Sequence, residues 1–190
     1  MGILLLCYEK SLVEYGINFI TYNSFNVLNM EVLDVVDKDD NIIGKAPKKE
    51  VYRKLLRHRI VHVLIFDNKG RMALQLRSKR VSFCPGHWCT SVGGHVQSGE
   101  SYEEAALREY QEELGTTSKL EFFSKDSYEV AGCPPKVLVT FKTQHDGPFF
   151  PNPDVVAKLE FFSIKEIEKM IKSGEKFHPE LLFLLRKYFL

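Results

Sequence analysis

One segment constrains the fold of this chain more than any other: residues 94–116 read GHVQSGESYEEAALREYQEELGT. On a helix with about 100° per residue, one side of this segment carries three carboxylates, those of Glu109, Glu112 and Glu113. The opposite side carries an apolar stripe of Leu107, Tyr110 and Leu114, which predicts packing against a core. Like charges at this spacing cost a helix roughly 0.2–0.5 kcal/mol per pair, so the cluster indicates a bound cation. Carboxylate ligands favour Mg²⁺ or Mn²⁺ over Zn²⁺.

The spacing within this segment matches a known signature. Seven positions fall at the offsets of the Nudix box, G-x5-E-x7-R-E-U-x-E-E-x-G-U with U a bulky apolar residue: Gly94, Glu100, Arg108, Glu109, Glu112, Glu113 and Gly115. Tyr110 fits the first U, and Thr116 departs mildly from the second. The chain therefore resembles Nudix hydrolases over about residues 31–190. The resemblance implies an α+β Nudix fold, with a mixed β-sheet between helices in an α/β/α sandwich.

The box residues have expected roles. We expect Glu109, Glu112 and Glu113 to be metal ligands, and the resemblance adds the backbone carbonyl of Gly94, because glycine lets the chain approach a metal closely. The expected catalytic residues are Glu109, Glu112 and Arg108, with the arginine orienting a box carboxylate through a bidentate contact. Two further residues are expected to support the site: Glu100 by bracing the loop against the arginine, and Gly115 by ending the helix.

The residue that activates water stays open. Glu109 from the box, Asp154 and Glu160 are the candidates. Related enzymes often carry glutamates just before the strand that leads to the C-terminal helix, but here Val155 and Lys158 stand in that region. A metal bridging diphosphate oxygens would neutralise charge and lower the pKa of a bound water.

Four side chains near the box are candidates for binding the substrate: His95, Arg77, Arg80 and Trp88. His95 follows the expected metal-site glycine, so it could contact a phosphate. Arg77 and Arg80 follow a predicted strand and precede the box loop, which places them on the phosphate side. Trp88 could stack on a base, although a lone tryptophan beside a strand is more often part of a core.

Strands are expected over residues 31–36, 42–45, 61–66, 72–76, 88–92, 122–130, 136–143 and 158–162, from alternation, β-branched residues and flanking turn residues. Helices are expected over residues 47–56, 101–114 and 163–172, and after Pro179. Ser101 with Glu104, and Ser163 with Glu166, have the spacing of capping boxes. Strands interleaved with helices predict helices on both faces of the sheet, which agrees with the sandwich that the resemblance implies.

Length and charge bound the remaining possibilities. The 190 residues suit one domain, and the net charge of +1 provides no strong field for nucleic acid or an anionic membrane. The four cysteines are scattered, which predicts reduced thiols in a cytoplasmic protein. Residues 1–29 lack the clean periodicity that begins at Met30. We expect this segment to be an accessory extension, or translation to start naturally at Met30.

Three functions are consistent with the sequence. The first is metal-dependent hydrolysis of a small-molecule diphosphate, such as a nucleoside diphosphate linked to another group, ADP-ribose included, or a damaged nucleoside triphosphate. The second is an isopentenyl-diphosphate isomerase, to whose subgroup residues 30–116 are similar. In that family a cysteine directly precedes the glycine-histidine pair, whereas this chain has Gly93. The third is a non-catalytic nucleotide-binding module. The intact box favours hydrolysis. The oligomeric state is open, and a homodimer is compatible with the sequence.

Overall fold

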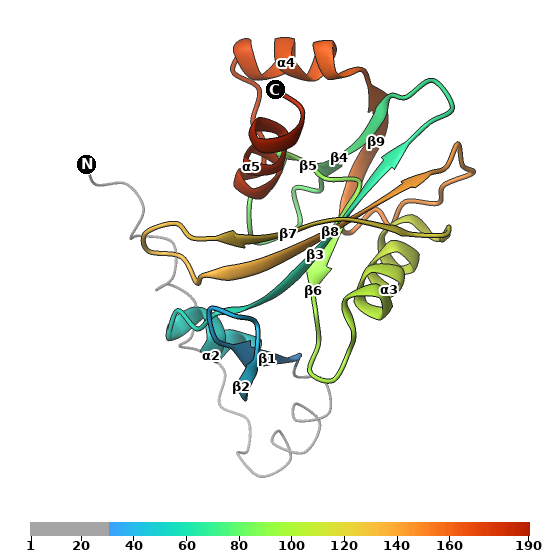
Figure 1. Cartoon of the computed structure of the whole chain (residues 1–190). Coiled ribbons are helices and arrows are strands. Elements are labelled where there is room, and N and C mark those ends of the chain that lie inside the picture. The colour runs from blue at the N-terminus through green and yellow to red at the C-terminus, as the bar shows by residue number, and fades with distance from the viewer. Residues whose placement is uncertain (1–30) are drawn as a thin grey trace, which may run out of the picture. The chain divides into compact units, whose positions relative to one another are not determined.

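The structure of the chain, a computed structural model, describes residues 31–190 (Figure 1). Its strands are β1 (Val32–Val36), β2 (Ile42–Pro47), β3 (His58–Phe66), β4 (Met72–Arg77), β5 (Trp88–Cys89), β6 (Val92–His95), β7 (Glu121–Tyr128), β8 (Lys136–Gln144) and β9 (Val156–Phe162). Its helices are α2 (Lys48–Arg53), α3 (Tyr102–Leu114), α4 (Ile164–Lys172) and α5 (Pro179–Tyr188). The expectations for residues 1–29 and for a start at Met30 lie outside the described residues.

Seven strands form one mixed sheet, with β3 and β8 parallel at its centre and the remaining pairs antiparallel. Helix α3 lies on one face, and α4 and α5 lie on the other (Figure 1). Each face has its own apolar cluster: Tyr110 of α3 packs with Val61 and Val139 in one, and Leu181 of α5 packs with Leu64 and Leu74 in the other. The expected α/β/α sandwich is confirmed.

Two different strands pair with β3 along one of its edges. β6 pairs with the first half of β3, whereas β4 pairs with its last residue and β5 pairs with β4. The expected single strand over residues 88–92 is therefore wrong. Between the two strands, the buried hydroxyl of Ser91 donates to the carbonyl of Ala73 (2.6 Å) and accepts from the N–H of Ile65 (2.9 Å). The serine side chain thus satisfies backbone groups that the interrupted ladder leaves without strand partners.

Strands β1 and β2 form a separate hairpin, and α2 follows it. The hairpin is tied to the loop between β6 and α3 through Ser98. The N–H of Ser98 donates to the carbonyl of Val32 (2.8 Å), and its hydroxyl donates to Asp34 (2.7 Å). These bonds hold the hairpin against the loop that precedes the box helix.

Helix α3 begins and ends where its sequence predicts. The Ser101 hydroxyl accepts from the N–H of Glu104, and the Glu104 carboxylate accepts from the N–H of Ser101, which forms the expected capping box. Gly115 ends the helix in the left-handed region, with a φ of 64° that favours glycine. Ser163 and Glu166 cap α4 in the same reciprocal way.

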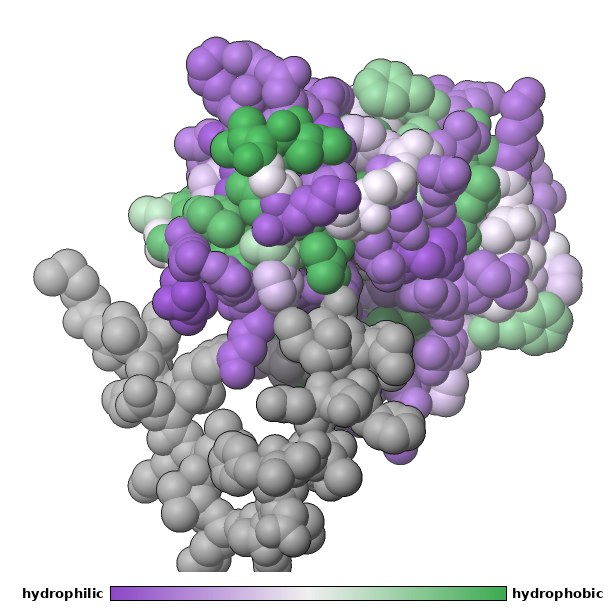
Figure 2. Space-filling view, turned by 90° about the horizontal axis from the view of Figure 1, so that it is seen from below, coloured by the Kyte–Doolittle hydropathy of each residue, from purple (hydrophilic) through white to green (hydrophobic). Residues whose placement is uncertain are grey.

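Figure 2 shows the molecule from below, and on this face hydrophobic residues form several patches among hydrophilic ones. Exposed apolar side chains of the hairpin include Ile42 and Ile43, which are 52% and 67% exposed. Within residues 31–190, no helix is both long and apolar enough to cross a bilayer.

Candidate active site at the double glycine

Gly93 and Gly94 lie in β6, paired with His62 and Val61 of β3. A Cβ added at Gly94 would overlap the carboxylate of Glu109 from α3. Any side chain at position 94 would therefore displace that carboxylate, and glycine is what allows it to lie against the backbone. The structure thus brings together two members of the expected ligand set, Gly94 and Glu109.

Glu113 occupies a buried position one turn further along α3. Its Oε2 accepts from the side-chain amide of Gln75 (3.1 Å) and from the N–H of Gly93 (3.3 Å). Burial raises the pKa of Glu113 to about 8, and the charge of Glu109 adds to this rise, while the two hydrogen bonds oppose it. A nearby cation would favour the charged form of this carboxyl group.

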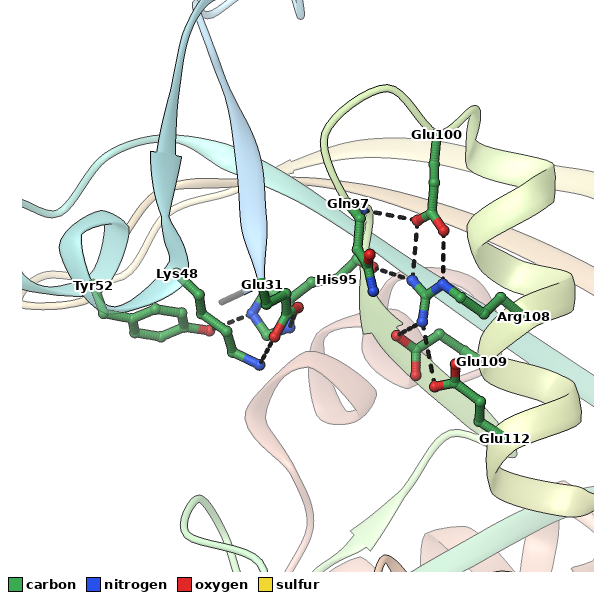
Figure 3. Close-up of polar contacts among 9 residues, drawn as sticks. All are labelled: Glu31, Lys48, Tyr52, His95, Gln97, Glu100, Arg108, Glu109 and Glu112. Atoms are coloured by element: carbon green, nitrogen blue, oxygen red, sulfur yellow. Dashed lines mark hydrogen bonds and ion pairs between the residues drawn. The ribbon is translucent and has the colours of Figure 1, made fainter. Parts of the chain in front are cut away.

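Arg108 connects the box helix to the preceding loop (Figure 3). Its Nε and Nη2 donate to the two oxygens of Glu100 (2.7 and 3.0 Å), and Nη2 also donates to the carbonyl of His95 (2.9 Å). Its Nη1 donates to Glu109 (2.8 Å). Arg108 therefore makes its bidentate contact with Glu100 and a single hydrogen bond with Glu109. Glu100 also accepts from the N–H of Gln97 (2.8 Å). Both the bracing and the orienting role fit these contacts.

The third carboxylate, Glu112, lies at the exposed side of the site. Its side chain is 58% exposed, and an oxygen lies 3.4 Å from Nη1 of Arg108. Burial raises the pKa of Glu109 despite its bond to Arg108, and the charges of Glu112 and Glu31 add to the rise. Negative charge thus accumulates around Glu109, as expected beside a cation site.

The donor chemistry fits Mg²⁺ or Mn²⁺, because Glu109, Glu112, Glu113 and the Gly94 carbonyl offer only oxygen atoms. The three carboxylates do not form a ready-made coordination site. Among residues 31–190, no group of three or more His, Cys, Asp or Glu side chains is arranged to hold a metal ion. Arg108 and Gln75 bind the carboxylates instead. The ligand assignment therefore stays a prediction.

Among the expected substrate-binding residues, His95 borders the site. Its Nε2 lies 2.9 Å from the hydroxyl of Tyr52, and its Nδ1 lies 3.5 Å from Glu31. Arg80 pairs with Asp154 on the surface, where both side chains are more than two-thirds exposed. Arg77 donates from Nε to the carbonyl of Phe83 (3.1 Å). Both arginines therefore have protein partners here.

Trp88 lies in the core instead of at the box. It belongs to the apolar cluster that α4 and α5 cover, with its ring centroid 5.2 Å from that of Phe162. Its Nε1 donates to Glu175 (2.7 Å). The sequence could not distinguish this position from a base-stacking one, because both place an aromatic residue beside a strand.

The candidates for activating water differ in their surroundings. Asp154 is held by Arg80, and Glu160 lies 2.8 Å from Lys158, both near the surface. Glu109 alone among the three is in the box, beside Gly94.

A buried cluster of three side chains, Lys136, Glu180 and His62, lies next to Gly93. The sequence analysis did not predict this cluster. Lys136 pairs with Glu180 of α5, and Nε2 of His62 lies 3.0 Å from the other oxygen of Glu180. Burial alone would raise the pKa of Glu180, but the bond from His62 and the charge of Lys136 outweigh it and lower that pKa far below its usual range. A Cβ at Gly93 would lie 2.8 Å from Nδ1 of His62, so this group fills the space behind position 93.

Comparison with known proteins identifies the family of this chain. The NUDIX domain model matches residues 56–185. An uncharacterised Nudix hydrolase of Streptomyces coelicolor is 34% identical over 147 residues, which cover 76% of this chain and 81% of that protein. An isopentenyl-diphosphate Delta-isomerase of Serratia proteamaculans is 41% identical over 101 residues, but these cover 53% of this chain and 56% of the isomerase. The crystal structure of DR0079 from Deinococcus radiodurans superposes with a TM-score of 0.70 at 26% identity, covering 84% of this chain and all of that one.

The fold and the box together define a Nudix domain. The chain belongs to the Nudix family and is a Nudix-type hydrolase.

Proposed function

We propose that this chain is a divalent-metal-dependent hydrolase that cleaves the diphosphate linkage of a nucleoside diphosphate joined to another group. Mg²⁺ or Mn²⁺ is the cofactor that its donor set suits. The observation that carries the proposal is the place of Glu109 against Gly94, where no side chain would fit. We expect a small-molecule substrate in the cytoplasm and no nucleic acid polymer.

In this proposal Glu109, Glu112, Glu113 and the Gly94 carbonyl hold the metal, which supplies charge neutralisation and a more acidic water. Arg108 keeps Glu109 in place and, through the His95 carbonyl and Glu100, fixes the end of β6 next to Gly94 and the loop that follows it. Among the three candidates for accepting the proton of water, we favour Glu109, because it lies in the box against Gly94, whereas Asp154 and Glu160 pair with surface cations.

The similarity to isopentenyl-diphosphate isomerases supports a second candidate, isomerisation of that diphosphate. That reaction moves protons on carbon and so needs an acid and a base at the reacting atoms. Against this candidate, the chain has Gly93 where those isomerases carry a cysteine, and a Cβ there would lie 2.8 Å from Nδ1 of His62 and 3.2 Å from the Thr90 hydroxyl. The nearby Cys89 is buried, and burial raises its pKa to about 12, which makes it a poor acid or base near neutral pH.

The direct test is a substrate panel with Mg²⁺ and with Mn²⁺, read out by mass spectrometry of the products. The panel contains nucleoside diphosphates linked to a second group, damaged nucleoside triphosphates and isopentenyl diphosphate. We expect cleavage within a diphosphate group. Formation of the dimethylallyl isomer would support the second candidate, and tight ligand binding without turnover would support a non-catalytic module.

Glu112→Gln tests the role of the metal ligands, with Glu103→Gln as the matched control. Both residues are exposed on α3, but Glu103 lies outside the box positions. We expect Glu112→Gln to lower metal-dependent kcat at least about a hundredfold and Glu103→Gln to leave it unchanged, because only the former removes a ligand charge. Equal activity of the two variants would contradict the assignment.

A further inference from the structure

Three residues from outside the matched domain lie beside the box. Glu31 precedes β1, and Lys48 and Tyr52 belong to α2, whereas the NUDIX domain model begins at residue 56. Figure 3 shows their side chains grouped around His95, across from the side chains of Glu109 and Glu112. The hairpin and α2 therefore form one wall of the candidate active site.

This wall is fixed in place by specific contacts. The N–H of Lys48 donates to the carbonyl of Glu31 (2.9 Å), and its ammonium donates to Oε2 of the same residue (2.8 Å). The other carboxylate oxygen of Glu31 lies 3.5 Å from Nδ1 of His95. His95 directly follows Gly94, and Arg108 holds its carbonyl. The ammonium of Lys48 is thus connected to the box through only two residues, Glu31 and His95.

Of the three basic side chains in Figure 3, Lys48, His95 and Arg108, Lys48 is the one that retains donors for a ligand. The guanidinium of Arg108 is already shared among Glu100, Glu109 and the His95 carbonyl. Both ring nitrogens of His95 already face protein groups, the Tyr52 hydroxyl at Nε2 (2.9 Å) and Glu31 at Nδ1 (3.5 Å). By contrast, the side chain of Lys48 is 41% exposed, and Glu31 takes one of its three ammonium donors.

We propose that Lys48 binds a non-bridging phosphate oxygen of the diphosphate substrate, and that Glu31 holds its ammonium in position to do so. The proposal rests on the proposed function, since it concerns the same site. A metal would neutralise part of the negative charge of a diphosphate. The ammonium of Lys48, a compact positive charge on the facing wall, would neutralise part of the negative charge that is left. Glu31 acts on the substrate only through Lys48, and is therefore a positioning residue.

The test compares Lys48→Gln and Lys48→Arg with Lys49→Gln, which removes the neighbouring, exposed positive charge of the same helix. Calorimetry measures binding of inorganic pyrophosphate in the presence of Mg²⁺, and steady-state kinetics use whichever substrate the panel identifies. We expect Lys48→Gln to weaken pyrophosphate binding and to raise KM about tenfold, with kcat changing less than about threefold. Lys48→Arg should recover most of the loss, and Lys49→Gln should match the wild type.

Thermal unfolding of each variant controls for the fold. Unchanged pyrophosphate affinity in a folded Lys48→Gln variant would overturn the proposal, as would an equal loss in Lys49→Gln. If the wild type binds pyrophosphate through Lys48 but cleaves nothing in the panel, the subsite stands and the proposed function fails. If it cleaves a substrate with a KM that does not depend on Lys48, the hydrolase stands and the subsite fails. A wild type that neither binds nor cleaves contradicts both.

Discussion

Gly94 shows how a missing side chain shapes this site. Its lack of a Cβ leaves room for the Glu109 carboxylate, and its neighbour Gly93 leaves room for the ring of His62. The two glycines therefore let groups from opposite faces of the sheet approach the same short strand. Glycine is the residue type that allows both approaches, because any Cβ would need one of those groups to move.

Gly94→Ala should abolish most activity without unfolding the protein. The added methyl group would overlap the Glu109 carboxylate, and a displacement of about 1 Å at a catalytic group can cost about a hundredfold in rate. We expect kcat/KM to fall at least that far. Gly44→Ala is the control, since nothing lies within 4 Å of its added Cβ. Full activity in a folded Gly94→Ala variant would show that the close approach is not required.

At the scale of elements, α5 is attached to the sheet by charge as well as by apolar packing. Glu180, in its first turn, binds Lys136 of β8 and His62 of β3, and all three side chains are at most 8% exposed. Such a group is costly to bury and becomes costlier when one partner is lost.

Glu180→Gln should destabilise the protein by about 3–5 kcal/mol, because it leaves the buried ammonium of Lys136 without its counter-charge. Glu168→Gln on α4 is the control, since it breaks the exposed pair with Lys172 and should cost at most about 0.5 kcal/mol. Urea unfolding measures both. Combining Glu180→Leu with Lys136→Met should recover much of the loss. Equal stabilities for the two single variants would mean that the buried pair does not anchor α5.

The sequence predicts elements whose signals are local and misses contacts that are distant along the chain. The capping pairs of α3 and α4 lie three residues apart, so their spacing is visible in the sequence. The partners His62 and Glu180 lie 118 residues apart, and Tyr52 and His95 lie 43 apart. Only the fold brings such residues together. The break between β5 and β6 was missed for the same reason, because it depends on which neighbouring strand each half meets.

The box itself was predictable as a pattern but not as an arrangement. Spacing placed Glu109, Glu112 and Glu113 on one helix, and the structure shows that each has a different environment. Trp88 was ambiguous in sequence, since a core position and a ligand position both put an aromatic side chain beside a strand.

At the scale of the whole molecule, the buried His58 and His178 and the half-buried His95 should make stability depend on pH. Burial lowers the pKa of His58 and of His178 to about 4, and lowers that of His95 far below its usual value. All three are neutral in the folded protein but take up protons near pH 6.5 when it unfolds. Their contribution to stability is therefore complete above about pH 6.5 and is lost as the pH falls towards 4.

We expect the free energy of unfolding to fall between pH 6.5 and 4 by about 1.4 kcal/mol per pH unit for each such histidine. His178→Asn keeps a side chain that can cap α5 and removes one of the three titrating groups. Urea unfolding at several pH values should show a shallower slope for this variant. A slope equal to that of the wild type would contradict the assignment of His178 as a buried neutral group.

One measurement tests the proposed metal site most directly: anomalous diffraction from crystals soaked with Mn²⁺ and a non-hydrolysable diphosphate analogue. We predict a manganese peak bound by Glu109, Glu112, Glu113 and the carbonyl of Gly94, with the analogue bound to the ion. A peak elsewhere, or no peak while Glu112 still points into solvent beside Arg108, would contradict the role assigned to this helix.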